Sequence, residues 1–282
     1  MMVNYFVDDK LGGVTSLNYN LITNCPKRSV KQCVILIRQI ESNMARANVI
    51  YPNAENELFS YTTKDNYYTT LKLLSKVIDR TAEGVLVLNY ETEMAMLDHY
   101  PAKQTTYQLI HDDYNVNLAL KYNHIVDVFI CHNTIIYEKM INLFPDRVEH
   151  IFYKPHGVPI PDKFRSSIGN GSVTPIKLLF IGRMVESKGI FDLPVINNLL
   201  RGKHISFEWT CIGSGPDLEK LKQVWNPLDK VVFLSPQKNE EVLEIAATQD
   251  VFVLPTKFEG SPVSLLEAMS VGLVPVVSKI PG

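Results

Sequence analysis

The sequence predicts an α/β protein with two consecutive domains, each built on a parallel sheet that helices cover on both faces. Short apolar runs alternate with longer amphipathic segments, a stretch rich in Gly, Pro and Ser interrupts this pattern once, and the alternation then restarts. Continuous apolar runs are typical of strands buried on both faces, and their alternation with helices is typical of parallel sheets. The 282 residues are enough for two domains of ordinary size.

The first predicted domain covers residues 1–155. Its expected strands are 4–7, 34–38, 85–89, 106–110 and 126–131. Helices are expected at 14–23, 66–80 and 92–98, with another between the last two strands. In segment 66–80 the apolar residues Leu71, Leu74, Val77 and Ile78 follow helical spacing.

The predicted linker covers residues 156–174, where Gly157, Pro159 and Pro161 precede a Ser- and Gly-rich run. The second domain is predicted as residues 175–282. Its expected strands are 177–181, 207–212, 231–234, 251–255 and 275–278, and its expected helices are 188–200, 217–224, 240–248 and 263–271.

Composition excludes several classes of protein. A net charge of −2 gives no overall field that would attract nucleic acid. The N-terminus lacks a basic segment followed by an apolar one, and no apolar run reaches the ~20 residues of a membrane helix. The four cysteines form no CxxC pair, so reduced thiols in a cytoplasmic protein are expected.

The most informative motif follows the expected strand 251–255. Glu259 lies in the loop, Glu267 lies in the next helix, and between them the helix begins. Backbone N–H groups at a helix start lack partners and attract phosphate oxygens. The candidate residues for binding a diphosphate here are Gly260, Ser261, Pro262, Val263, Ser264 and Leu265.

A second motif, Gly182-Arg183 followed by Lys188-Gly189, comes at the end of the expected strand 177–181. Two cations at a strand end neutralise a diphosphate without a metal ion, and Arg does so through two parallel hydrogen bonds. The alternative is that Arg183 and Lys188 are ordinary surface cations.

Together these segments resemble the Glu-x7-Glu and Gly-Arg-x4-Lys-Gly motifs of family 4 glycosyltransferases. The resemblance implies the GT-B fold, in which two Rossmann-like domains face a cleft. It also implies that Glu259 contacts the donor sugar, that Glu267 binds the ribose, and that Arg183 and Lys188 stabilise the leaving diphosphate.

Weaker matches extend this resemblance. Gly12 and Gly13 follow the first strand, where the family has a Gly-Gly turn that faces the donor. His111 ends the strand 106–110 and is similar to a family histidine beside the donor sugar, although a structural role is the alternative. Gly213 is similar to a glycine that lets the nucleotide approach the backbone. Asp112 and Asp113 are expected to cap the next helix.

The resemblance implies a retaining transferase that moves a hexose from a UDP- or GDP-linked donor to a hydroxyl of a saccharide or lipid-linked acceptor. No other cofactor is expected, and no metal either, because the sequence contains no Asp-x-Asp and no clustered His/Cys ligands. The alternatives are a non-catalytic GT-B partner or chaperone of an active transferase, and a GT-B sugar-nucleotide epimerase.

Two further expectations concern surfaces. Lys72, Lys76 and Arg80 would share one stripe of the helix 66–80, either as a solvated face or as a peripheral contact with the inner face of the membrane. In family relatives the chain continues beyond the counterpart of Gly282, so the second domain is expected to be incomplete, with an exposed apolar sheet edge and weak turnover.

Overall fold

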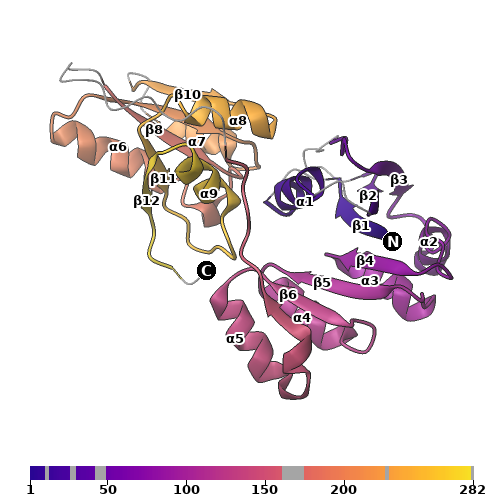
Figure 1. The fold of residues 1–282 in the computed structure, drawn as a ribbon. Coiled ribbons are helices and arrows are strands. Elements are labelled where there is room, and N and C mark those ends of the chain that lie inside the picture. The colour runs from indigo at the N-terminus through magenta and orange to yellow at the C-terminus, as the bar shows by residue number, and fades with distance from the viewer. Residues whose placement is uncertain (10–12, 26–29, 42–48, 161–174, 226–228, 281–282) are drawn as a thin grey trace. The chain divides into compact units, whose positions relative to one another are not determined.

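A computed structural model describes residues 1–9, 13–25, 30–41, 49–160, 175–225 and 229–280. The chain divides into an N-terminal unit, Met1–Gly157, and a C-terminal unit, Val158–Pro281 (Figure 1). Most of the predicted linker lies outside the described residues. Each unit is a mixed α/β fold on a parallel sheet, as the sequence predicted.

The N-terminal sheet has seven parallel strands in the order β3-β2-β1-β4-β5-β6-β7. Their bounds are β1 Met2–Asp8, β2 Lys31–Gln39, β3 Glu55–Tyr61, β4 Gly84–Leu88, β5 Thr105–Ile110, β6 Val128–Cys131 and β7 Ile151–Tyr153. The sequence pattern did not reveal β3 or β7.

Alternate residues of the central strands enter two different cores. Phe6 of β1 and Ile35 of β2 belong to one buried cluster, whereas Val7 of β1 and Val34 of β2 belong to another. Because successive side chains of a strand point to opposite faces, both faces of this sheet are covered.

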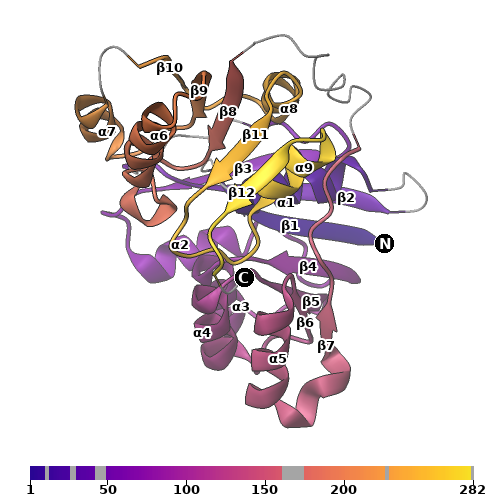
Figure 2. The ribbon, with the colours of Figure 1, turned by 90° about the vertical axis from the view of Figure 1, so that its left-hand side faces the viewer.

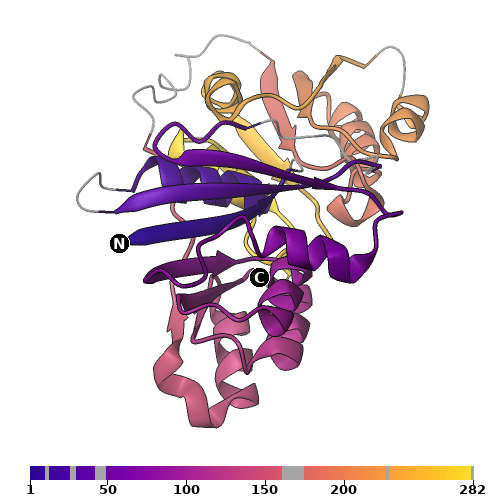
Figure 3. The ribbon, with the colours of Figure 1, turned by 90° about the vertical axis from the view of Figure 1, so that its right-hand side faces the viewer.

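Five α-helices and one short 3₁₀ helix cover the described part of this sheet. They are α1 Gly13–Thr23, α2 Tyr67–Leu74, α3 Glu91–His99, α4 Asp113–Tyr122, α5 Thr134–Leu143 and η1 Pro145–His150. Neighbours among α2, α3, α4 and α5 contact each other in a row, and the row from α2 to α4 is visible in Figure 3.

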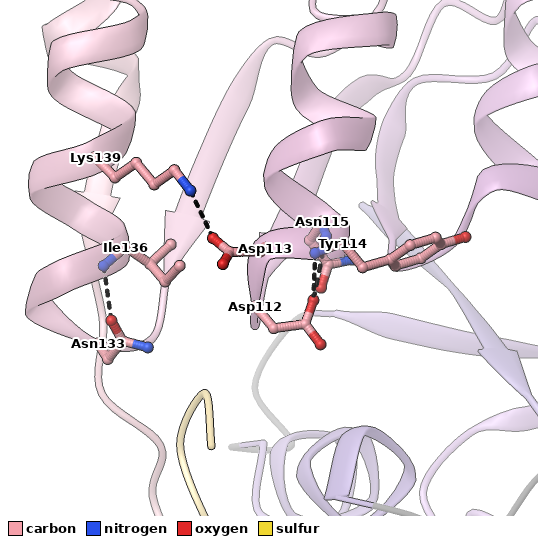
Figure 4. A network of polar contacts seen from close by, with 7 residues as sticks. All are labelled: Asp112, Asp113, Tyr114, Asn115, Asn133, Ile136 and Lys139. Carbon is pink, nitrogen blue, oxygen red and sulfur yellow. Dashed lines mark hydrogen bonds and ion pairs between the residues drawn. The ribbon is translucent and has the colours of Figure 1, made fainter. Parts of the chain in front are cut away.

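Side-chain caps fix the starts of α4 and α5 (Figure 4). Asp112 Oδ1 accepts hydrogen bonds from the N–H groups of Tyr114 and Asn115, at 3.0 and 3.2 Å. Asn133 caps α5 in the same way. The predicted capping role of Asp112 is confirmed, whereas Asp113 lies in the first turn and pairs with Lys139 at 2.7 Å. Each cap satisfies N–H groups that a helix start leaves unbonded.

The predicted helix 66–80 is wrong in its second half, because α2 ends at Leu74. The hydroxyl of Ser75 donates to Lys72 O at 2.8 Å and competes with the helical backbone bonds. Lys76 and Arg80 lie beyond this helix end, so the predicted basic stripe does not form on one helix. Among the described helices, none is long and apolar enough to cross a membrane.

The C-terminal sheet has five parallel strands in the order β10-β9-β8-β11-β12, and Figure 2 shows β8, β11 and β12 side by side. The strands are β8 Ile176–Ile181, β9 Phe207–Ile212, β10 Val231–Leu234, β11 Val251–Leu254 and β12 Val274–Val277. The helices are η2 Glu186–Lys188, α6 Asp192–Gly202, α7 Leu218–Val224, α8 Asn239–Ala246 and α9 Val263–Ser270.

Two features of this unit bear on the predictions. The helix predicted from residue 188 begins only at Asp192, because Gly189 adopts a left-handed conformation (φ 69°) that ends η2. The last strand, β12, is a sheet edge whose Val274, Val276 and Val277 are 43–54% exposed.

Candidate active-site loops

The two strongest sequence motifs follow neighbouring strands of the C-terminal sheet. Arg183 and Lys188 come after β8, and Glu259 comes after β11, which pairs with β8. Gly213 follows β9 on the other side of β8. Because all these strands are parallel, the three loops lie at the carboxyl edge of one sheet, where ligands of α/β proteins bind.

Backbone contacts hold the loops after β8 and β9 together. Met184 N–H donates to Ser214 O at 2.8 Å, and Asp217 N–H donates to Met184 O at 3.1 Å. Gly213 has φ 146°, and a Cβ at this position would lie 1.9 Å from Gly182 O. This close approach already requires glycine, so contact between Gly213 and a nucleotide stays a prediction.

The loops after β8 and β11 are joined even more closely. Ser187 O accepts hydrogen bonds from Lys257 N–H at 2.9 Å and from the Thr256 hydroxyl at 3.2 Å. Lys188 Nζ lies 2.5 Å from Glu259 Oε1, and the two side chains are only 19% and 12% exposed. The predicted phosphate-binding lysine and the predicted sugar-binding glutamate are therefore direct neighbours.

Arg183 differs from Lys188 in its surroundings. Its side chain is exposed and forms no hydrogen bond or ion pair with the described residues. A guanidinium in this state is available to an incoming anion. Lys188 must instead share its charge between Glu259 and any bound phosphate.

Helix α9 begins four residues after Glu259, the partner of Lys188. Pro262 is its N-cap, Gly260, Ser261 and Ser264 are half-buried, and Val263 is buried. Leu265 N–H already donates to Pro262 O at 3.0 Å. The N–H groups of Val263 and Ser264 precede this first bond of the helix, which makes them the candidate donors to a phosphate.

Glu267 lies in the second turn of α9 and is 4% exposed. Its side chain therefore belongs to the interior of this unit, and its predicted contact with a ribose stays a prediction.

In the N-terminal unit, Gly12 lies outside the described residues. Gly13 is the first residue of α1, it is exposed, and an added Cβ would meet no heavy atom within 4 Å. The structure gives Gly13 no packing reason to be glycine, and its predicted place near the donor stays a prediction.

His111 directly follows β5 and stacks with His132 and His156, with ring centroids 4.9 and 5.9 Å away. Its Nε2 donates to Asn89 Oδ1 at 3.1 Å, because the amide nitrogen of Asn89 itself donates to Phe6 O. Burial lowers the pKa of His111 well below its ordinary value and that of His156 to about 3. A neutral His111 suits hydrogen bonding to a sugar hydroxyl better than stabilising negative charge.

Two features near this site were missed in the sequence. Asn89 is fully buried and links β1, β4 and His111. Glu93 of α3 is fully buried, and its Oε1 accepts from Asn89 N–H at 2.8 Å and Tyr90 N–H at 2.5 Å. The only sequence signal was a polar residue at a strand end, followed by an acid in the first turn of a helix.

Burial raises the pKa of Glu93 from 4.5 to about 7, although the backbone hydrogen bonds oppose this shift. Between these pH values the folded protein binds more protons than the unfolded chain, so the free energy of unfolding falls as pH rises. Glu93→Gln keeps an acceptor for both N–H groups and removes the charge. We expect its stability relative to the unsubstituted protein to increase between pH 5 and 8 by about 3 kcal/mol.

Urea unfolding followed by circular dichroism at both pH values checks this expectation. Asp113→Asn, which neutralises an exposed carboxylate of the same unit, is the control and should show no comparable gain. Equal pH dependence of Glu93→Gln and the unsubstituted protein would contradict the raised pKa.

The chain has relatives among characterised and solved proteins. Residues 175–282 match the family model for glycosyl transferases group 1. The amylovoran biosynthesis glycosyltransferase AmsK of Erwinia amylovora is 36% identical over 130 residues, which cover 42% of this chain and 31% of AmsK. The gpi3 subunit of the phosphatidylinositol N-acetylglucosaminyltransferase of Schizosaccharomyces pombe is 24% identical over 164 residues, which cover 57% of this chain and 35% of that protein. The chain thus matches about a third of the length of these relatives.

Solved structures match across the chain. The sucrose-phosphate synthase of Thermosynechococcus elongatus has a TM-score of 0.73 at 14% identity, covering 100% of this chain and 82% of that one. The lipopolysaccharide outer core galactosyltransferase WaaB has a TM-score of 0.64 at 17% identity with the same coverage. Staphylococcus aureus TarM, solved in complex with UDP, has a TM-score of 0.62 at 18% identity over 75% of this chain and 44% of TarM.

These likenesses agree with the motif loops, because the matched segment contains Arg183, Lys188 and Glu259. The chain has the GT-B fold, and its residues 175–282 match the family model for glycosyl transferases group 1.

Proposed function

We propose that the protein is a retaining glycosyltransferase that moves a hexose from a UDP- or GDP-linked donor to a hydroxyl of a saccharide or lipid-linked acceptor, without a metal ion. The observation that carries this proposal is the contact between Lys188 and Glu259, which brings the diphosphate-binding motif and the sugar-binding motif together beside the exposed Arg183.

The chemistry follows from what the donor must lose. The bond between the anomeric carbon and the diphosphate oxygen breaks, and the electron pair leaves with the diphosphate. Arg183, Lys188 and the N–H groups at the start of α9 would stabilise that charge, which is the kind of interaction that lowers barriers most. The acceptor hydroxyl oxygen bonds to the anomeric carbon, and its proton passes to the departing diphosphate oxygen.

Glu259 would accept hydrogen bonds from hydroxyl groups of the donor sugar. The ammonium group of Lys188, which pairs with Glu259 in the structure, would then also interact with the diphosphate. Glu267 and Gly213 would contact the nucleoside, and His111 Nδ1 would accept a hydrogen bond from a sugar hydroxyl. These roles rest on the motif resemblance together with the placement of the loops.

The relatives support the substrate classes. TarM was solved with UDP, and AmsK is named for the biosynthesis of amylovoran, which supports a nucleotide-sugar donor and a role in polysaccharide biosynthesis. The gpi3 relative is named as a subunit of a phosphatidylinositol N-acetylglucosaminyltransferase. This name supports a second possibility, in which the acceptor is lipid-linked and the protein contacts the membrane peripherally.

A thermal-shift panel of UDP- and GDP-linked hexoses tests the proposal. A ligand at 100 times its Kd stabilises the folded state by about 2.7 kcal/mol, so at least one donor should raise the Tm clearly. Analysis of products should then show nucleoside diphosphate release that depends on an added acceptor. Epimerised donor without acceptor would indicate the epimerase alternative, and the absence of any nucleotide binding would favour the non-catalytic partner.

A further inference from the structure

A pocket of about 220 Å³ lies at the carboxyl edge of the N-terminal sheet, within residues that the motifs do not include. Its walls come from the ends of β1 to β4 and the starts of α3 and α4. The residues used below are Asp8, Gln39, Tyr61, Tyr90, Glu93 and Tyr114. Drug-sized ligands occupy pockets of ~300–1,000 Å³, so this one suits a single small group.

The pocket is acidic and aromatic. Three of its nine lining residues, Asp8, Glu91 and Glu93, are carboxylic acids, three are tyrosines, and none is Lys or Arg. Lys121 pairs with the lining residue Glu91 at 2.6 Å, and Arg38 pairs with Asp9 at 2.6 Å. Carboxylates accept hydrogen bonds from hydroxyl groups, and aromatic faces pack against the apolar face of a sugar ring.

Glu93 shows that this acidity is built in. It is fully buried, and its Oε2 has no hydrogen-bond partner among the described residues, while Oε1 is held by two backbone N–H groups. Burying a carboxyl group with an unsatisfied oxygen costs free energy. Since Glu93 has no accessible surface, it supplies charge beneath the pocket, and Asp8 and Gln39 supply contacts at its wall.

We propose that this pocket is the subsite for an uncharged, hydroxyl-bearing sugar unit of the acceptor, and that Asp8 and Glu93 exclude anionic groups such as uronates and phosphates. The proposal rests on the proposed transferase function and narrows its acceptor. An anionic group would lie within a few ångströms of two carboxylates, which is unfavourable even with strong solvent screening.

Matched glycosides test the proposal at pH 8, where Glu93 is ionised. Methyl glucoside and methyl galactoside are compared with methyl glucuronide and methyl galacturonide, which differ only in the carboxylate at C6, by ligand-observed NMR titration. We expect one neutral glycoside to bind and its uronide to bind at least tenfold more weakly, which corresponds to about 1.4 kcal/mol.

Variants locate the binding. Asp8→Asn and Glu93→Gln should each reduce the discrimination against the uronide, to about threefold or less when combined, and Tyr114→Ala should weaken both glycosides. Asp113→Asn, on the same helix as Tyr114 but outside the pocket, should change neither. Equal binding of glycoside and uronide, or binding that these variants leave unchanged, would overturn the proposal.

Nucleotide binding in the same samples separates this proposal from the function on which it rests. If UDP or GDP binds but neither neutral glycoside does, the pocket assignment fails alone. If a glycoside binds with the predicted selectivity and no nucleotide binds, the transferase function fails and the pocket remains a sugar-binding site.

Discussion

Lys188→Ala is expected to lower the turnover of the preferred nucleotide sugar by about 10²–10³-fold. Its ammonium group lies 2.5 Å from Glu259, a residue four positions before the start of α9. In this variant, no partly buried cation would remain at position 188 to stabilise the negative charge that develops on the leaving diphosphate. Binding of the nucleoside diphosphate should weaken by about 10–100-fold, because a hydrogen bond to a charged group contributes about 1.5–3 kcal/mol.

The chain contains a matched control for this substitution. Lys257 pairs with Glu186 at 2.9 Å and joins the same two loops, but these side chains are 58% and 67% exposed. Exposed pairs contribute about 0–1 kcal/mol, so Lys257→Ala should leave nucleotide binding nearly unchanged. Similar losses in the two variants would mean that the loop connection matters and that Lys188 does not contact the diphosphate.

A second measurement separates the two proposed roles of Lys188, which are stabilising the fold by pairing with Glu259 and binding the diphosphate. Its removal also leaves Glu259 without its cation, which lowers stability independently of any ligand. Adding Glu259→Gln to Lys188→Ala should restore part of that stability without restoring diphosphate binding. A thermodynamic cycle over the two positions, measured by urea unfolding and by calorimetry, therefore isolates the phosphate contribution.

The Lys188–Glu259 contact shows where sequence reasoning ends. The motifs predicted that each residue acts on the donor, and strand–helix alternation placed both at strand ends. The two residues are 71 positions apart, and their contact depends on β8 and β11 being neighbours in the sheet. Sequence periodicity predicts strands, but it does not determine their order.

The missed elements have a physical cause. β3 reads Glu-Asn-Glu-Leu-Phe-Ser-Tyr and lies mostly exposed at the sheet edge, so it lacks the continuous apolar run by which buried strands are recognised. The opposite error occurred in segment 66–80, where Leu71, Leu74 and Ile78 follow helical spacing and are buried although α2 ends at Leu74. The backbone leaves the helix at Ser75, and apolar spacing contains no information about that local hydrogen bond.

Glu93 and its pocket were unpredictable for another reason. An acid in the first turn of a helix normally interacts with the helix dipole at the surface. It is completely buried, and the residues around its pocket, such as Asp8, Gln39 and Tyr114, come from distant parts of the sequence. The residues of the proposed acceptor subsite are thus brought together only by folding, whereas short motifs mark the candidate donor-binding residues.

Gly189→Ala should destabilise the C-terminal unit by about 3–5 kcal/mol, the range of severe single substitutions. Gly189 has φ 69°, and an added Cβ would lie 1.8 Å from Pro255 O. A left-handed conformation alone costs a non-glycine residue roughly 1–2 kcal/mol. The clash adds to this cost, because the contact is with backbone and one of the two loops must move.

Gly202→Ala is the matched control at the end of α6. An added Cβ there meets no heavy atom within 4 Å, and φ is not positive. Because alanine is favoured over glycine in helices by up to about 1 kcal/mol, this variant should be neutral or more stable. Both variants replace glycine by alanine. Changes of opposite sign in the free energy of unfolding would therefore isolate the effect of the backbone contact at Gly189.

Intrinsic fluorescence reports the result for this unit alone, because both tryptophans of the chain, Trp209 and Trp225, lie in it. The urea midpoint of the fluorescence transition should fall sharply for Gly189→Ala and stay or rise for Gly202→Ala. Since the hydrogen bonds from Thr256 and Lys257 to Ser187 O adjoin the clash, Gly189→Ala should also displace Glu259 and weaken nucleotide binding. An unchanged midpoint would mean that the two loops are not packed together and that the proposed diphosphate site is not formed in this way.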